Sequence, residues 1–387
     1  MMTKNQINER EQLEILTIEQ LVPANHLVRK LDAAIDFSFI YPLVENLYSQ
    51  FGRPSIDPVV LFKMTMIQYV FGIRSMRQTI KEIETNVAYR WFLGFGFHTE
   101  VPHFSTFGKN YVRRFENTDV FEQIFYCILK EIVEEGLLSA DHIFIDSTHV
   151  KASANKRKFD KKMVRKETRA YEEKLQEELN IDREKNGKKP FPPEKFEKEE
   201  WKEIKESTTD PESGYYVKDE RTKQFAYSFH AATDERGFVL GTIVTPGNIH
   251  DSHILQPLVE KVIEKVKKPL AVAADAAYKT PAITNFLLEN QMLPVLPYTR
   301  PKTKDGFFRK HDYVYDEHND CYICPNDQML PYVTTTKEGY RQFKSNPTIC
   351  ANCPFLQQCT ESKNHTKLIQ RHIWEAYVEE AEHLRHH

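Results

Sequence analysis

The spacing of apolar residues divides the chain into a helical first part and a mixed α/β remainder. In the first part apolar side chains recur at helical spacing. Asp57 followed by Pro58 is typical of a helix start, and Gly72 is typical of the end of that helix. Ser75 then predicts the cap of a second helix, an arrangement that resembles a helix-turn-helix. We therefore predict an all-α N-terminal domain over residues 1–136.

Beyond residue 140 the pattern changes to short apolar runs that are bounded by turns. HIFID (142–146) and PLAVAAD (269–275) are typical of buried strands. Residues 224–233 and 237–247 predict a β-hairpin. The order is strand, insertion, hairpin, helix, strand, helix, strand, which is the order of an RNase-H-like fold. We expect an α/β RNase-H-like core over residues 140–300, with a mixed sheet flanked by helices and the first strand beside the second.

Two segments depart from this core pattern. Residues from about 155 to 215 are charged and poor in large aliphatic side chains, so we interpret them as an insertion that is part helix, part mobile and outside the core. Residues 315–360 are rich in cysteine, and we expect a small zinc-ribbon-like segment there, followed by a late helix in residues 365–387. Cys127, on an apolar helix face, is expected to be a reduced, partly buried thiol.

Length, charge and composition limit the number of domains, the kind of partner and the cellular location that we expect. A chain of 387 residues has room for two or three domains, and its net charge of −3 gives no reason by itself to expect a nucleic-acid partner. Locally, however, Lys151–Lys166 contains eight Lys or Arg residues and one acid. The sequence shows neither a signal peptide nor an apolar run of membrane-spanning length, so we expect a cytoplasmic protein. A cytoplasmic protein that bound DNA would be associated with the nucleoid.

Two acids follow directly on predicted strands. Asp146 ends the run HIFID and Asp275 ends PLAVAAD, so both are expected at the carboxyl edge of neighbouring central strands. Magnesium prefers carboxylate oxygens, and phosphodiester cleavage commonly uses divalent ions held by such groups. The alternative is that both aspartates simply terminate strands of a generic α/β fold.

Longer segments around these acids resemble the DDE transposases of bacterial insertion sequences. The similar segments are IDSTHVKASANK (145–156), TPGNIHDSHIL (245–255) and ADAAYKTP (274–281), together with residues 51–80 and 102–115. The resemblance covers nearly the whole chain.

The resemblance implies a function and a set of catalytic groups. Asp146 and Asp275 would be the first and second catalytic acids and would hold Mg²⁺ or Mn²⁺. The partner would be double-stranded DNA, both the terminal inverted repeats of the element and the target, bound by a homodimer or a higher oligomer. One strand would be hydrolysed, and the freed 3′-hydroxyl would attack the target. Asp251, together with His250, matches a recurrent family segment as an accessory group, although Asp251 could also cap the following helix.

The family also uses a late glutamate within the pattern Tyr-x2-Arg-x3-Glu-x6-Lys, from which this chain departs. Arg371 and Glu375 have the required spacing, but Leu368 and Glu382 stand where the pattern has Tyr and Lys. We interpret Glu375 as a solvated helix residue and expect the motif beyond His387, in a C-terminally truncated chain. Two alternatives stay open, namely a catalytically incomplete DNA-binding remnant or inhibitor of transposition, and a cellular RNase-H-like nuclease.

The cysteines predict a second kind of metal site. Two C-x2-C pairs, Cys321 with Cys324 and Cys350 with Cys353, can give Zn²⁺ a tetrahedral thiolate site, and Cys359 lies just beyond them. Clustered cysteines in a cytoplasmic chain favour metal over disulfides. Soft thiolates do not suit Mg²⁺, so this would not be the catalytic metal. The alternative is a set of reduced, partly buried thiols.

Basic side chains near these segments are candidates for DNA contact. Such contacts neutralise phosphates and make affinity depend on salt. The alternative is that they are ordinary surface charges. The candidates are Arg74, Arg77, Arg113, Arg114, Lys151, Lys156, Arg157 and Lys158.

Overall fold

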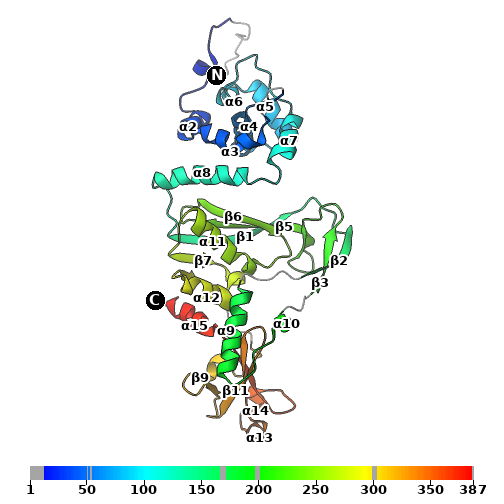
Figure 1. Ribbon diagram of the computed structural model, residues 1–387, viewed down its shortest axis with the longest axis vertical. Helices are drawn as coiled ribbons and strands as arrows, with labels where there is room; N and C mark the ends of the chain where they lie inside the picture. The colour runs from blue at the N-terminus through cyan, green and yellow to red at the C-terminus, as the bar shows by residue number, and fades with distance from the viewer. Residues whose placement is uncertain are drawn as a thin grey trace, which may run out of the picture. The chain divides into compact units, whose positions relative to one another are not determined.

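The computed structural model describes residues 13–49, 51–52, 55–165, 171–196, 201–298 and 303–385. Lys166 and His387, which belong to the expectations above, lie outside these ranges. The chain separates into two compact units, Met1–Glu134 and Glu135–His387, and each is described by itself (Figure 1).

Every regular element that the structure describes in the N-terminal unit is helical. Its core is formed by buried aliphatic and aromatic side chains, among them Leu61, Ile67, Ile83 and Phe92. The elements are α1 (Ile18–Leu21), α2 (Leu27–Ala34), η1 (Phe37–Phe39), α3 (Ile40–Val44), η2 (Glu45–Leu47), α4 (Pro58–Val70), α5 (Met76–Thr85), α6 (Val87–Phe92), α7 (Phe104–Asn110), the π-helical η3 (Tyr111–Phe115) and α8 (Val120–Glu134).

The predicted boundaries of α4 and α5 are confirmed, for the expected physical reasons. Asp57 Oδ1 accepts a hydrogen bond from the backbone N–H of Val59 at 2.8 Å, with proline in the first turn. Gly72 follows with a φ of 64°, which favours glycine at a helix end. Ser75 Oγ then caps α5.

The central sheet of the second unit is mixed. Strand β5 lies beside β1 in antiparallel register, and β1 lies beside β7 in parallel register, so the first strand pairs with the second as expected. The order is β4-β5-β1-β7-β8, with β6 also on β5. The strands are β1 (His142–Lys151), β4 (Gly214–Val217), β5 (Lys223–Thr233), β6 (Val239–Pro246), β7 (Ala271–Ala274) and β8 (Leu293–Val295), and the connecting helices are η4 (Asp251–His253), α11 (Leu255–Lys265), η5 (Ala276–Tyr278) and α12 (Pro281–Glu289).

Two glycines allow the ends of β4 and β6 to approach the same stretch of β5. The N–H of Gly247 donates to the carbonyl oxygen of Ala226 at 2.8 Å. A Cβ on Gly247 would lie 2.7 Å from that oxygen, and a Cβ on Gly214 would lie 2.2 Å from Oδ1 of Asn248. This close packing explains why glycine stands in the segment TPGN at the end of β6.

The insertion holds more ordered structure than its composition indicates. Strands β2 (Phe159–Arg165) and β3 (Trp201–Ser207) form an antiparallel pair, and α9 (Glu172–Lys185) and α10 (Pro193–Phe196) lie between them in sequence. The expectation of a partly helical insertion is confirmed. The expectation that it lies outside the core is wrong for α9, because Leu175 and Leu179 are buried. Two leucines on one face are enough for burial, although the rest of the helix is charged.

The last part of the unit is a second sheet, larger than the segment that the cysteines indicated. Its strands are antiparallel in the order β13-β12-β11-β10-β9, over a core that includes Tyr322, Leu330 and Phe343. The elements are η6 (Lys310–Asp312), β9 (Val314–Asp316), β10 (Cys321–Ile323), β11 (Met329–Thr335), β12 (Tyr340–Lys344), α13 (Pro347–Cys350), α14 (Leu356–Cys359), β13 (Leu368–His372) and α15 (Glu375–Leu384).

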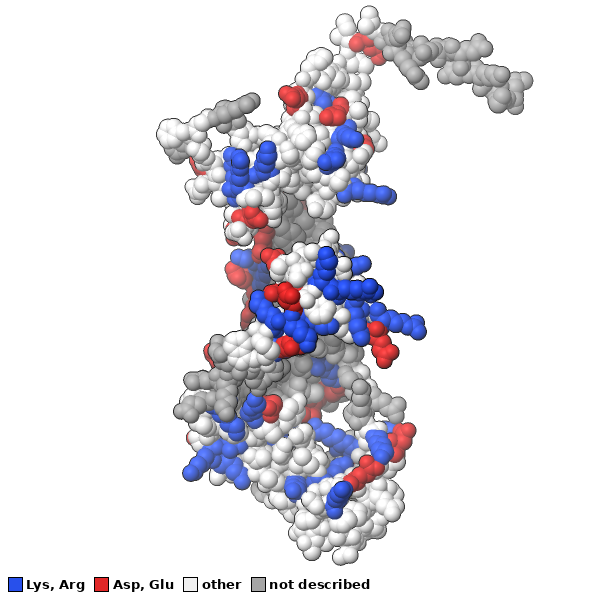
Figure 2. Space-filling model, turned by 90° about the vertical axis from the view of Figure 1, so that its right-hand side faces the viewer, with Lys and Arg blue, Asp and Glu red and all other residues white. Residues whose placement is uncertain are grey.

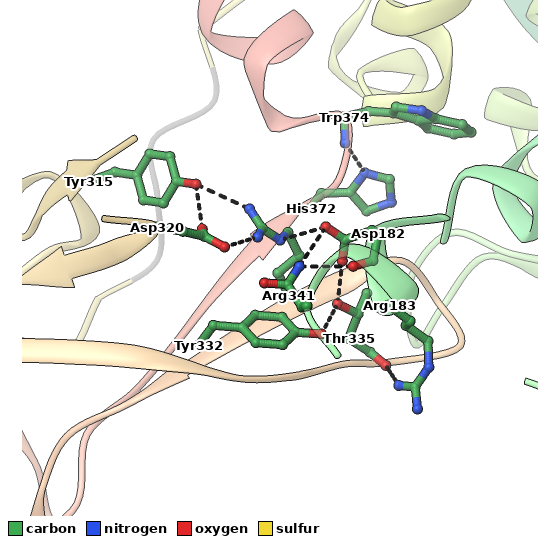
Figure 3. Close-up of polar contacts among 10 residues, drawn as sticks. Asp182, Arg183, Tyr315, Asp320, Tyr332, Thr335, Arg341, His372 and Trp374 are labelled. Carbon is green, nitrogen blue, oxygen red and sulfur yellow. Dashed lines mark hydrogen bonds and ion pairs between the residues drawn. The ribbon is translucent and has the colours of Figure 1, made fainter. Parts of the chain in front are cut away.

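Polar contacts connect helix α9 with α12, beside the central sheet, and with strands β11 and β12 of the second sheet. Lys174 Nζ donates to Asn285 Oδ1 on α12 at 2.9 Å. At the other end of α9, Asp182 Oδ2 accepts from the hydroxyl of Thr335 on β11 at 2.6 Å and pairs with Arg341 on β12 (Figure 3). These contacts connect the inserted helix with the helix beside the central sheet and with the second sheet.

Candidate active site

Asp146 and Asp275 meet at one edge of the central sheet. Ile145 on β1 and Ala274 on β7 are partners in the parallel register, and each aspartate is the next residue in the chain. Asp275 directly follows the end of β7, but β1 continues to Lys151, so the expectation that both acids end their strands is wrong for Asp146. Both aspartates are exposed to solvent. Asp275 Oδ1 accepts from the N–H of Ala277 at 2.9 Å, which leaves its other oxygen available to a ligand. The structure thus brings the two predicted catalytic acids together.

A buried tyrosine lies next to this pair of acids. Tyr278, in the 3-10 turn that follows Asp275, is completely buried. Burial raises the pKa of its hydroxyl, and the carboxylate of Asp251 raises it further. Asp275 and Asp146 add to the same effect, so three carboxylates lie within electrostatic reach of one hydroxyl group.

The hydroxyl of Tyr278 belongs to a small polar network inside the sheet. Nδ1 of the buried His230 on β5 lies 3.3 Å from the Tyr278 hydroxyl and 3.9 Å from Asp251 Oδ1. Nε2 of the same ring lies 3.2 Å from the hydroxyl of Thr245. Burial lowers the pKa of His230, while Asp251 acts in the opposite direction. The network therefore fixes a buried imidazole behind the two acids.

The structure locates Asp251 and His250, the two possible accessory groups, at the start of η4. His250 caps the 3-10 turn η4, since its Nδ1 accepts from the N–H of Ser252 at 3.2 Å. The interpretation of Asp251 as a helix cap is wrong, because its side chain faces His230 instead. His250 is exposed at the surface.

His230 and Tyr278 were not singled out from the sequence. A signal existed for His230, because it occupies the inward-facing positions of β5 together with Ala226, Ser228 and Ala232. A histidine at such a position must find polar partners when it is buried. Tyr278 gave no comparable signal, since a tyrosine in a helical turn is ordinary.

The donor set at this edge suits a hard divalent cation. Magnesium is commonly held by one or two carboxylates, with water and substrate oxygens completing its shell, and Asp146 with Asp275 supplies two carboxylates. Among the residues that the structure describes, no three His, Cys, Asp or Glu side chains converge as a formed metal site. The two carboxylates are the donor type that a hard divalent cation prefers.

The late helix does not leave Glu375 free in solvent. Its carboxylate lies 2.5 Å from Lys310 Nζ and accepts from the N–H of His372 at 3.2 Å, with the side chain 18% exposed. The expectation of a solvated helix residue is therefore wrong. Glu382 of the same helix pairs with Lys279, which follows Tyr278 in the chain. Helix α15 thus contacts the segment after Asp275 through Glu382.

Basic side chains gather in the stretch that follows β1. Lys151, the last residue of β1, is exposed. Lys156, Arg157 and Lys158 are exposed in the loop that leads to β2, and Figure 2 shows Lys and Arg side chains gathered on this part of the surface. Farther along, Glu203 and Glu206 on β3 pair with two lysines of β2, which neutralises part of the basic run.

The four arginines predicted in the N-terminal unit fall into two groups. Arg74 and Arg113 are exposed, as is Arg77, whose guanidinium lies 4.4 Å from the ring centroid of Phe104. Arg114 is half-buried, bonded to Asn110 and stacked 4.5 Å from the ring of Tyr48. The first group is available to a phosphate, whereas Arg114 is engaged within the unit.

The cysteines form a different set from the two sequence pairs. A small cavity of about 30 Å³ lies beside the second sheet, and its lining includes Cys324, Cys350, Cys353 and Cys359. Cys321 does not line it. The cavity therefore brings three of the four predicted zinc ligands together with Cys359 and leaves Cys321 out. Cys127, on α8, is a partly buried free thiol, as expected.

Comparison with known families identifies the chain. A family profile described as a transposase DDE domain matches residues 138–346, more than half of the 387 residues. The chain belongs to the DDE transposases. A second profile with that description matches residues 323–387 of the transposase, and one described as a transposase domain (DUF772) matches residues 16–113. No curated protein and no solved structure matches it.

Membership in the family sets the chemistry in outline. A DDE transposase domain implies DNA as the partner and a divalent metal ion as cofactor. The matched region contains Asp146, Asp251 and Asp275, so the edge described above lies within the family's catalytic domain. Among the described residues, no helix combines the length and apolar character that crossing a membrane requires.

Proposed function

We propose that this transposase binds the terminal repeats of its own element and cuts them with a divalent ion held by Asp146 and Asp275. The observation that carries the proposal is the register of β1 and β7, in which Ile145 is paired with Ala274. Asp146 follows Ile145 within β1 and Asp275 follows Ala274 directly after β7, so this register favours two acids side by side. Two aspartates without a shared function would have no reason to follow directly on a pair of residues that are partners in the sheet.

The strand order supports an RNase-H-like core. An antiparallel set, β6-β5-β1, is extended by β7 and β8, which are parallel and follow helices. That is the arrangement expected from the order of elements along the chain. The edge that carries both aspartates is then the one where the substrate phosphate binds.

The residues at this edge have distinct tasks. Asp146 and Asp275 would hold the cation, Mg²⁺ or Mn²⁺, and a bound cation would supply polarisation of the phosphate and activation of water. The capping bond from Ala277 fixes the orientation of the Asp275 carboxylate. Behind it, Tyr278 and His230 form a buried support that limits the movement of the turn. Hydrolysis frees a 3′-hydroxyl, and that group attacks the target phosphodiester.

Exposed basic residues bind the DNA backbone. Lys151, Lys156, Arg157 and Lys158 neutralise phosphates near the sheet edge, because they follow Asp146 on the same strand and the next loop. Arg74, Arg77 and Arg113 make phosphate or base contacts from the N-terminal unit. Paired element ends require two active sites, so the reacting species is a dimer or a higher oligomer.

One observation favours a second function. Within the described ranges no third acid joins Asp146 and Asp275 as a metal-binding group. A chain that binds element ends without cutting them would act as an inhibitor of transposition.

The test uses a labelled duplex that carries the element's ends, with the full chain and Mg²⁺ or Mn²⁺. We expect nicking at the element boundary, lost at least a hundredfold in Asp146→Asn and Asp275→Asn and retained in Asp160→Asn, which changes an exposed acid of β2. End binding without nicking by the wild type would favour the inhibitor. Nicking that survives both substitutions would contradict the proposed site.

A further inference from the structure

Four thiols from three separate turns converge on one cavity in the second unit. Cys324 lies between β10 and β11, Cys350 ends α13, Cys353 lies in the next turn and Cys359 ends α14. Each is half-buried and none forms a disulfide. The other lining residues include Tyr313 and Lys367. Below, these four cysteines are called the cavity thiols.

The turns that carry the cavity thiols are closed by backbone hydrogen bonds. The N–H of Asp327 donates to the carbonyl of Cys324 at 2.8 Å, and Asp327 has a φ of 52°, so the chain reverses tightly after Cys324. The N–H of Cys353 donates to the carbonyl of Cys350 at 3.1 Å. These closed turns hold the backbone of Cys324, Cys350 and Cys353 in place around the cavity, and C-x2-C spacing such as that of Cys350 and Cys353 is typical of structural zinc sites.

Strand geometry explains why Cys321 is not one of the cavity thiols. Successive side chains of a strand point to opposite faces. Tyr322 of β10 packs in the same apolar cluster as Cys324 and Cys359, so Cys321 faces the other way. Burial raises the pKa of the Cys321 thiol, and Asp316 and Asp320 raise it further. Burial raises the pKa of the Cys359 thiol as well, so the positions of the two side chains distinguish them, not their pKa values.

We propose that the cavity thiols bind one zinc ion as a tetrahedral thiolate site. Zinc prefers soft sulfur ligands in fours, whereas a hard ion such as Mg²⁺ does not. The volume of about 30 Å³ suits a single ion better than an iron–sulfur cluster. Binding deprotonates four thiols and releases their protons to solvent. The site is independent of the catalytic edge and of the proposed function.

Polar neighbours around the cavity match the charge that such a site would carry. Lys367 Nζ donates to the carbonyl of Cys359 at 2.9 Å, which places an ammonium group beside the thiolates. The Tyr313 hydroxyl lies 3.1 Å from Cys359 Sγ and can donate to it. Outer groups of this kind orient metal ligands. No three cavity thiols are yet close enough to count as a formed site among the described residues, so binding requires rotation of cysteine side chains.

The experiment measures zinc in the purified full chain by elemental analysis and replaces zinc by Co²⁺. We expect about one zinc per chain and the intense absorption of tetrahedral cobalt thiolate. Zinc should be lost in Cys359→Ser and retained in Cys321→Ser, the matched control from the sequence pair. The reverse result, zinc lost in Cys321→Ser and kept in Cys359→Ser, would overturn the assignment, as would iron in place of zinc.

A second measurement does not depend on the folding of a variant. The wild-type chain is alkylated with and without a zinc chelator, and the modified cysteines are located by mass spectrometry. The proposal expects chelation to increase alkylation of the cavity thiols together, while Cys321 and Cys127 react equally in both samples. Alkylation of Cys359 that ignores the chelator would overturn it.

Discussion

Nε of Arg341 on β12 lies 3.1 Å from Oδ1 of Asp182 on α9, and the two side chains are only 14% and 17% exposed. The geometry is that of an ion pair rather than of an aligned hydrogen bond at Nε. Asp320 pairs with the same guanidinium, whose Nη1 donates to the hydroxyl of Tyr315 at 3.1 Å (Figure 3). One arginine thus joins the inserted helix to two strands of the second sheet.

Removal of this arginine should destabilise the second unit. Arg341→Met leaves Asp182 and Asp320 without their partner in a largely buried place, and we expect a loss of about 3 kcal/mol in the free energy of unfolding. Urea denaturation followed by circular dichroism measures it. Arg221→Met, at an exposed position, is the control and should change stability by less than about 0.5 kcal/mol. Equal effects of the two substitutions would contradict the structural role of Arg341.

Gly247 should not tolerate a side chain. In Gly247→Ala the new Cβ would lie 2.7 Å from the carbonyl oxygen of Ala226, so the ends of β5 and β6 must separate. We expect a loss of about 1–3 kcal/mol, measured by thermal or urea unfolding. Gly108→Ala is the control, because nothing lies within 4 Å of its added Cβ and it sits inside α7. That change should be neutral or stabilising, since alanine favours a helix.

His372 should make the second unit sensitive to acid. Burial lowers its pKa to about 4 from the ordinary value of 6.5, while Nδ1 accepts from the N–H of Trp374 at 3.1 Å. Between these two pH values only the unfolded chain binds the proton. The contribution of His372 to the free energy of unfolding is therefore fully present above about pH 6.5. It falls by up to about 3 kcal/mol as the pH drops to about 4.

Unfolding measured between pH 4 and 7 checks this dependence. His372→Asn keeps an acceptor near the position of Nδ1 but cannot titrate, so the slope of stability against pH should decrease. His365→Asn replaces an exposed histidine with a residue that also tolerates its φ of 52°, and the slope should not change. An unchanged slope in His372→Asn would show that other groups cause the acid sensitivity.

Tyr278 should act on the metal site through position. Tyr278→Phe removes the hydroxyl beside His230 and should reduce cleavage more at limiting than at saturating Mn²⁺, because Asp275 is held less firmly. Its matched control is Tyr227→Phe, which loses a 2.6 Å hydrogen bond to Asp210. Both substitutions should lower the free energy of unfolding by about 1 kcal/mol. The Mn²⁺ concentration that cleavage requires should rise only in Tyr278→Phe. The same shift in both would show a merely structural effect.

Local signals predicted the elements, and spacing predicted the pair of acids. The cap at Asp57 and the apolar runs before Asp146 and Asp275 depend on neighbours in sequence, and such signals are visible in a single chain.

Contacts between distant segments could not be predicted in this way. The burial of α9 depends on residues more than a hundred positions away, because Leu175 packs with Ala282 and Trp374. Whether Cys321 or Cys359 lines the cavity depends on the face of β10 that Cys321 occupies and on where α14 packs. Likewise, Asp251 has the sequence position of a helix cap, and only the packing of η4 against η5 turns it toward His230.

The most direct test of the catalytic edge is Mn²⁺ binding, followed by electron paramagnetic resonance in the full chain. It does not require the chain to cut DNA. We predict a bound population of Mn²⁺ that is strongly weakened by Asp146→Asn and equally by Asp275→Asn, and that persists in Asp160→Asn. Binding that is unaffected by both substitutions, or that depends on only one of the two aspartates, would contradict a shared metal site at this edge.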